Sequence, residues 1–232
     1  SSANCALPMT IMNAIVGKQL LDFKAEVDKL IKAGEGKEGA IMRVLRQYII
    51  DSKRVLFEGD GYSDAWEKEA KKRGLSNVKT TPYALDFYNS KKANDVLVST
   101  NIYSARELEA RVEILHHNYV LKIDTEARIL ADIAINQIIP SALTYMNSLL
   151  ANIKGLKEAG VAPASAKAQK EIVSTIAASV NAIKVAVDKL KDAKDKAHNA
   201  KATSDMSKAY CDKVKPYFDE IRNHVDLLET LV

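Results

Sequence analysis

The sequence predicts an all-α protein in which long helices form an antiparallel helical bundle, with an irregular region of short helices in the first half. Three observations predict this class. Only 9 Gly and 5 Pro occur in 232 residues, so the elements are few and long. Ala, Leu, Lys and Glu, which favour helices, are abundant. Apolar residues recur at intervals of three and four, as they do along one face of a helix.

Composition bounds the class of protein and its partners. Hydrophobic residues make up 47% of the chain and charged residues 28%, the balance of a globular protein with a core of its own. The 34 basic and 30 acidic residues are interspersed, and even the lysines between Lys191 and Lys201 have aspartates among them. A nucleic-acid binder more often shows a one-sided basic stripe, so we expect no nucleic-acid partner.

Hydropathy and cysteine usage indicate the compartment. No uninterrupted apolar run approaches the roughly 20 residues that span a bilayer, and no signal peptide is recognisable, so we expect no membrane partner and a cytoplasmic location. Cys5 and Cys211 lie at opposite ends of the sequence. One disulfide between them is conceivable, but two cysteines do not make the stapled framework of a small secreted domain.

Residues 1–56 are predicted to form two helices. The first runs from about Pro8 to Ala33 and ends at Gly34-Glu35-Gly36, because glycine accepts the left-handed conformation of a helix end. The apolar face of the first helix consists of Met12, Val16, Leu20, Phe23, Val27 and Leu30, and the stripe of the second consists of Ile41, Leu45, Tyr48 and Ile49.

Residues 57–103 are predicted to be an irregular region with short helices. It opens with FEGDGYS, in which two glycines permit turns. Ser63 or Asp64 then caps a short helix that ends at Gly74, and Thr81 before Pro82 starts another. Within this region, only Asp95 to Ser99 has a pattern in which a short strand competes with a helix.

Residues 104–232 are predicted to form the long-helix bundle. Ser104 and Glu107 make a capping box that opens a helix reaching about Ala159. We expect Pro140 to kink or break this helix, because its ring removes a backbone hydrogen bond and clashes with the preceding turn. The apolar face of the helix comprises Leu108, Val112, Leu115, Tyr119, Ile123, Leu130 and Ala134.

Two more helices complete the predicted bundle. The hinge Gly160-Val161-Ala162-Pro163 precedes a helix over about 164–200, and Ser204 is the expected N-cap of a helix over about 205–232. Short connections favour antiparallel packing of the three long helices. The apolar seam of the helix over about 164–200 consists of Ile172, Ile176, Val180, Ile183, Val187 and Leu190. The seam of the helix over about 205–232 consists of Met206, Tyr210, Val214, Phe218, Ile221, Val225 and Leu228.

Both ends of the sequence favour a piece of a longer polypeptide. The chain opens with Ser1 rather than Met, and it stops at Val232 inside a helical apolar pattern without a following Gly or Asn cap. We therefore expect the parent protein to continue beyond these ends.

The residue patterns contain no assembled active site. The neighbours His116 and His117 point about 100° apart on a helix and do not readily share one metal ion. Glu113 and His116 make one Glu-x-x-His pair, but a di-metal bundle needs a second. Neither cysteine belongs to a CxxC motif, and the glycines of FEGDGYS do not match a phosphate-binding loop. We therefore predict no catalytic and no metal-binding residue in this chain.

Three blocks of the sequence resemble a known family. Residues 1–20 read SSANCALPMTIMNAIVGKQL and resemble the turn and helix that follow the last catalytic strand of glutamine synthetases, although Cys5-Ala6-Leu7 departs from the family's A-N-P-Y-L form. Residues 57–86 read FEGDGYSDAWEKEAKKRGLSNVKTTPYALD and resemble a segment of the large type III enzymes. Residues 107–160 are similar to the long helix of the same proteins, and the last 70 or so residues match in length and helicity.

The resemblance implies a function for the parent protein. It would be an ATP-dependent ligase that makes glutamine from glutamate and ammonia, with two Mg²⁺ or Mn²⁺ ions and with catalytic residues on a barrel upstream of Ser1. It implies no cofactor bound by this chain. Its partners would be that upstream barrel and neighbouring subunits of a ring-based homo-oligomer. The residues that would lie near the parent active site are Ser1, Ser2, Ala3 and Asn4.

Two other classes of function remain open from the residues alone. The Ala- and Lys-rich pattern after Ala164 is also typical of a free-standing helical scaffold or coiled-coil adaptor. A metal-binding bundle enzyme built around Glu113 and His116 is the third possibility.

Overall fold

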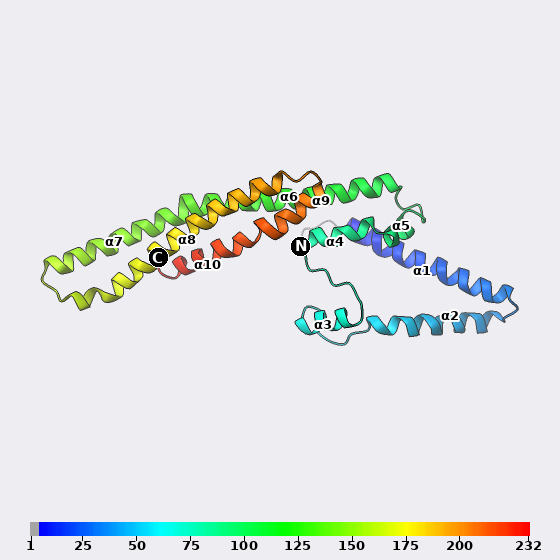
Figure 1. Cartoon of the computed structure of the whole chain (residues 1–232). Helices are drawn as coiled ribbons and strands as arrows, with labels where there is room; N and C mark the ends of the chain where they lie inside the picture. Colours follow the sequence, from blue (N-terminus) through cyan, green and yellow to red (C-terminus); the bar gives the residue numbers. More distant parts are fainter. Residues whose placement is uncertain (1–4) are drawn as a thin grey trace. The chain divides into compact units, whose positions relative to one another are not determined.

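A computed structural model describes residues 5–232 (Figure 1). All regular elements in this range are helical, which confirms the all-α prediction. The described chain divides into two compact units, one that ends at Val112 and one that begins at Glu113. The finer division into residues 1–56, 57–103 and 104–232 stays a prediction.

A helical hairpin opens the first unit. It consists of α1 (Ala6–Lys32) and α2 (Lys37–Ser52). Gly34 has φ +96°, and the amide of Glu35 donates to the carbonyl of Leu30 over 3.1 Å, so the predicted glycine stop of the first helix is confirmed. Val27, Ala40 and Val44 are buried between the two helices, beside an edge-to-face contact of Phe23 and Tyr48.

Only part of the predicted apolar stripes is covered in this unit. Phe23, Val27 and Leu30 pack against α2, whereas the N-terminal half of the same α1 face, Met12, Val16 and Leu20, is 55–63% exposed. This half stays uncovered by α2 because α2, with 16 residues, is shorter than α1, with 27. In α2 the small Ala40 and Val44 are buried instead of the predicted Leu45 and Ile49, which are exposed.

Short helices follow, as predicted. They are η1 (Lys53–Val55), α3 (Asp64–Lys72), α4 (Thr81–Leu85), η2 (Asp86–Asn89) and α5 (Lys91–Leu97). The Ser63 hydroxyl caps α3 by accepting from the Trp66 amide, and Gly74, with φ +66°, ends it. The possible strand at Asp95 is wrong, because that residue lies inside α5.

A second small core lies between α1, α5 and the start of α6 (Ala105–Ile133). Its buried members are Ala14, Leu97, Leu108 and Val112. The capping box at the start of α6 is confirmed: the Glu107 carboxylate accepts from the Ser104 amide at 2.8 Å, and the Ser104 hydroxyl accepts from the Glu107 amide at 3.2 Å. The bonds that the Ser104 amide and hydroxyl donate to the Glu107 carboxylate lower the pKa of this carboxyl.

The second unit is the predicted antiparallel bundle. The rest of α6 continues through η3 (Ala134–Ile138) into α7 (Ile139–Glu158), and α8 (Lys167–His198) returns after η4 (Pro163–Ala166). The chain ends with α9 (Thr203–Ala209), η5 (Tyr210–Val214) and α10 (Pro216–Glu229). Helix α8 packs on both α7 and α10, and Figure 1 shows these helices side by side.

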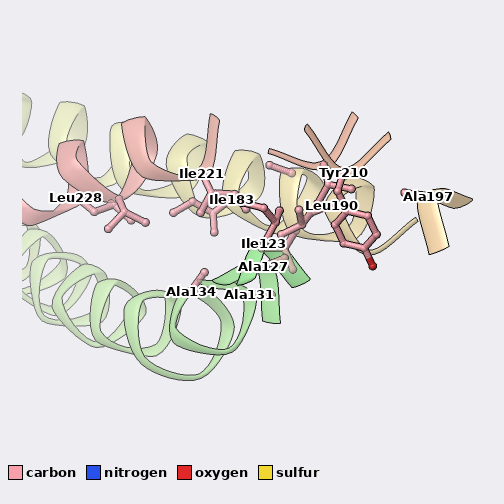
Figure 2. Close-up of a cluster of buried hydrophobic side chains, with 14 of the residues drawn as sticks. Ile123, Ala127, Ala131, Ala134, Ile183, Leu190, Ala197, Tyr210, Ile221 and Leu228 are labelled. Atoms are coloured by element: carbon pink, nitrogen blue, oxygen red, sulfur yellow. The ribbon is translucent and has the colours of Figure 1, made fainter. Parts of the chain in front are cut away.

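The core of the bundle follows the predicted seams. Figure 2 shows Ile183 and Leu190 of α8 meeting Ile221 of α10 and Ala127 of α6. Ile176, Val187, Val214 and Leu228 are also fully or almost fully buried. The predicted N-cap at Ser204 is wrong: α9 begins two residues earlier than predicted, at Thr203, and the cap position is Ala202.

Both prolines inside the long helices follow a π turn. The Ile139 amide bonds to the Ala134 carbonyl just before Pro140, and the Lys215 amide bonds to the Tyr210 carbonyl just before Pro216. The predicted break at Pro140 takes the form of the π turn that precedes it, and a kink there stays a prediction. Such a turn takes up one extra residue and relieves the crowding that proline causes in a regular α-helix.

Candidate functional site: a buried polar cluster in the bundle

The sequence-predicted site residues do not come together. Ser1, Ser2, Ala3 and Asn4 lie outside the described residues. Glu113 and His117 are exposed on α6, whereas His116 is only 2% exposed. Among residues 5–232 no group of three or more His, Cys, Asp or Glu side chains is placed to hold a metal ion.

His116 contacts a residue that the sequence analysis missed. Its Nδ1 lies 2.7 Å from the hydroxyl of the fully buried Ser207 on α9. That hydroxyl donates its only proton to the Ser204 carbonyl at 2.8 Å. The Ser207 oxygen therefore accepts from His116, which assigns the proton to Nδ1. The pair fixes α9 against α6.

Asp124 is the centre of the polar contacts one layer along the bundle. Its carboxylate accepts from the hydroxyl of Tyr210 at 3.2 Å and pairs with Arg128 at 2.9 Å. Lys194 on α8 lies 3.5 Å from the same carboxylate. Because Asp124 and Lys194 side chains are only 22% and 24% exposed, their pair is less screened than a surface ion pair. One carboxylate thus links three helical segments.

Burial holds the tyrosines of this cluster in their neutral form. Removal from water, followed by the charge and hydrogen bond of Asp124, raises the pKa of Tyr210 to about 12. Burial and the hydrogen bond to the Cys211 thiol likewise raise the pKa of Tyr119. Both phenols are hydrogen-bond donors at neutral pH, and neither is prepared as a base.

The two thiols do not form the conceivable disulfide. Cys5 is exposed, and Cys211 is buried in η5 beside Tyr119. The described cluster therefore contains hydroxyl, imidazole and carboxylate groups that satisfy one another between helices. Such an arrangement stabilises and orients a bundle. The contact of Ser207 with His116 does not activate the serine, because its hydroxyl gives its proton to the Ser204 carbonyl and accepts from His116.

Two hollows lie in the separate units. One, of about 420 Å³, lies between α6, η3 and α8, with Ala127 and Leu190 on its floor and the charged side chains of Arg128, Asp132 and Lys191 on its walls. The other, of about 300 Å³, lies between α1, η2 and α5 and has almost wholly apolar walls that include Ile11, Phe87 and Val96. In the first hollow Arg128 and Lys194 are paired with Asp124, and the second lacks the convergent polar groups that a catalytic pocket needs.

Comparison with known proteins identifies the family. The family model of the glutamine synthetase C-terminal domain matches residues 40–157. The chain is 46% identical over 158 residues, 68% of its length, to glutamine synthetase of Bacteroides fragilis (strain YCH46), of which it covers 22%. It is 32% identical over 156 residues, 67% of its length, to the type-3 glutamine synthetase of Dictyostelium discoideum, of which it covers 21%.

A third relative agrees with the first two. The chain is 29% identical over 145 residues, 60% of its length, to glutamine synthetase of Butyrivibrio fibrisolvens, of which it covers 21%. The chain thus spans about a fifth of the length of these relatives. The family model covers half of the chain, including most of α2, the irregular region, α6 and almost all of α7. This all-helical chain belongs to the glutamine synthetase C-terminal domain family.

Proposed function

We propose that this chain is the C-terminal helical region of an ATP-dependent glutamine synthetase and that its role is structural. The parent enzyme would make glutamine from glutamate and ammonia. The observation that carries the proposal is the family membership of a chain that spans about a fifth of its relatives. The buried polar groups support it, since those described above are paired between helices.

The catalytic groups of the proposed enzyme would lie upstream of Ser1, on a barrel that binds ATP, glutamate and two Mg²⁺ or Mn²⁺ ions. In this account Ser1 to Asn4 lie near that site, and the rest of the chain binds no cofactor. The carboxylates of Glu107 and Asp124 support this division, because one caps a helix and the other links helices. The proposed location is the cytoplasm.

The proposed partners are the upstream barrel and neighbouring subunits. The uncovered half of the α1 face supports such contacts. Met9, Met12, Val16 and Leu20 are 55–63% exposed and lie on one side of the helix. Contiguous exposed apolar residues mark an interaction surface in a soluble protein. We propose that this stripe packs on the catalytic part of the same polypeptide.

The role in assembly is tested in the complete polypeptide. Ile183→Asp places a charge at a fully buried position of the bundle, and Lys184→Ala changes its exposed neighbour. We expect the first variant to lose the assembled mass in light scattering together with ligase activity, and the second to keep both. Full assembly and activity in a variant whose bundle has lost its helical circular dichroism would contradict the proposal.

A further inference from the structure

The hollow between α6, η3 and α8 has the size and the location of a small-molecule site. Its volume of about 420 Å³ lies in the range of roughly 300–1,000 Å³ that is typical of such sites, which bundles form between their helices. The floor is apolar and closed, since Ala127, Ala131 and Leu190 are 2%, 7% and 1% exposed (Figure 2). The two alanines of α6 leave open the space that longer side chains would fill.

One end of the hollow is formed by the π turn η3, through Ile135 and Asn136. The Asn136 amide donates to the Asp132 carboxylate at 2.6 Å, which holds the asparagine against the wall that α6 provides. Single π turns inside α-helices lie frequently at functional sites. The π turn is therefore a second observation, beside the volume, that favours a binding site here.

Most of the cationic side chains around the hollow are neutralised within the bundle. Arg128 and Lys194 pair with Asp124 at 2.9 and 3.5 Å. Lys191 and Asp195 differ from them, because neither forms an ion pair in the part of the chain that the structure describes. Both side chains belong to α8 and line the hollow.

A matched pair on the same helix shows that the open state of these two charges is not general. Lys184 and Asp188 stand seven residues earlier on α8 with the same spacing of four, and they form an ion pair. A lysine and an aspartate four residues apart are neighbours on a helix and can pair in this way. At the hollow, Lys191 and Asp195 remain apart, so one ammonium group and one carboxylate are available to a bound molecule.

We propose that this hollow binds a free α-amino acid with an aliphatic side chain. The carboxylate of the ligand pairs with Lys191, its ammonium group pairs with Asp195, and its side chain lies on the apolar floor. Hydrogen bonds between charged groups are the stronger ones, and they fix the orientation of a small ligand. Covering the floor removes apolar surface from water. The inference does not depend on the structural role proposed for the chain.

An inorganic anion is the competing ligand, because three cationic side chains line the hollow. Two of them are already paired with Asp124, and Asp132 and Asp195 add negative charge to the walls. With Asp124 included, three cations face three carboxylates, so no net charge is left to attract an anion such as phosphate. An inorganic anion would also leave the apolar floor uncovered. A zwitterion with an apolar side chain matches both features.

Equilibrium dialysis of the complete polypeptide against radiolabelled L-leucine tests the inference with a matched pair of variants. Lys191→Gln removes the ammonium group at the hollow, and Lys184→Gln makes the same change seven residues earlier on α8. Both lysines are exposed, so the fold is retained in either variant. We expect a leucine site with a dissociation constant on the order of 1 mM, at least about tenfold weaker in Lys191→Gln and unchanged in Lys184→Gln.

Two analogues of leucine test the two halves of the proposed contact. 4-Methylpentanoate lacks the ammonium group, and glycine lacks the aliphatic side chain. Each should bind at least about tenfold more weakly than leucine. Asp195→Asn should weaken leucine binding as Lys191→Gln does, because it removes the partner of the ammonium group. Leucine bound elsewhere in the polypeptide is the same in both lysine variants and cancels in their comparison.

Each other outcome overturns the inference. Equal leucine binding by Lys191→Gln and Lys184→Gln places the site elsewhere, and no binding at about ten times the expected constant rules it out. Equal binding of 4-methylpentanoate shows that no ammonium group is recognised. Displacement of leucine by inorganic phosphate assigns the hollow to an anion. None of these results refutes the structural role in the ligase, which is judged by assembly and activity of the complete polypeptide.

Discussion

His116 donates from Nδ1 to the hydroxyl of Ser207, 91 residues later in the sequence and 2.7 Å away. The contact joins α6 to α9, and the Ser204 carbonyl accepts the proton of the same hydroxyl. A histidine beside another histidine is easily interpreted as a metal ligand. In this fold the buried member of the pair fastens two helices, and its exposed neighbour His117 does not share that position.

His116→Ala should therefore destabilise the bundle. The change removes a buried ring and leaves the Ser207 hydroxyl without its donor, so we expect a loss of about 2–4 kcal/mol in the free energy of unfolding. Urea unfolding followed by circular dichroism measures it. His117→Ala is the control and should stay within about 0.5 kcal/mol of wild type. Equal effects of the two substitutions would show that the Ser207 contact is unimportant.

The raised pKa of Tyr210 leads us to expect that the free energy of unfolding falls at alkaline pH. Its pKa is raised to about 12 from an ordinary value of 10.0, so the folded state favours the neutral phenol. This contribution is fully present below pH 10 and is lost as the pH rises through about 12. Tyr210→Phe should flatten the dependence in that window, because it removes one of the groups that must ionise. Identical pH profiles of the unfolding free energy would contradict the assignment.

The π turn before Pro140 leads us to expect that Pro140→Ala restores the stability lost when Gln137 is deleted. Deleting the exposed Gln137 should turn η3 into a regular α turn, because Ala134 and Ala142 would then lie seven residues apart on one face. Pro140 would then clash inside that helix at a cost of about 3 kcal/mol. We expect Pro140→Ala to recover most of this loss.

Two controls make the test specific. Pro140→Ala alone should keep the π turn, since the buried residues still require the extra position. Deleting Glu126 from the regular part of α6 should be far more damaging, because it rotates the residues that follow by about 100° against the core. Chemical-shift mapping of residues 130–145 and urea unfolding report the two effects. The idea fails if the Glu126 deletion is tolerated as well as the Gln137 deletion.

Alanine substitutions at Gly17, inside α1, and at Gly34, just after its end, should change stability in opposite directions. Gly34 has φ +96°, so a side chain there is strained, and Gly34→Ala should cost about 1–2 kcal/mol. Gly17 lies inside α1 with nothing within 4 Å of an added methyl group, so Gly17→Ala should gain up to about 1 kcal/mol. Thermal unfolding of the two variants gives the comparison, and shifts of the same sign would refute the conformational argument.

Features of the fold that are encoded locally were predictable from sequence. The capping box at Ser104, the glycine ends at Gly34 and Gly74, and the α8 seam with Ile183 and Leu190 each depend on residues within a few turns. Spacing or turn chemistry within that distance determines them. The structure confirms these elements at their predicted places.

Features that depend on distant parts of the chain were missed. The burial of His116 could have been inferred from spacing, because His116 lies four residues after the buried Val112 and four before the buried Val120. Its polar ring excluded it from the apolar pattern. Its partner Ser207 has no local pattern. The π turn before Pro140 also had a sign in the spacing of core residues. Ala134, Ile138 and Ala142 are separated by two successive intervals of four, which exceeds two turns of a regular α-helix. Which half of the α1 face is covered depends on the length of α2 and on partners.

That this chain holds no catalytic and no metal-binding residue stays a prediction. The polar groups described around Asp124 are used for helix packing. The four residues proposed to lie near the parent active site, Ser1 to Asn4, precede the described range. The proposed structural role therefore rests on the family membership and on the bundle itself.

Glutamine formation by the 232-residue chain, alone and joined to the preceding part of its own polypeptide, tests the central claim most directly. The account predicts no ATP- and glutamate-dependent glutamine synthesis by the chain alone, and activity when the upstream barrel is restored. Folding of the isolated chain is checked by its helical circular dichroism. Measurable ligase turnover by these residues without the upstream part would contradict the account.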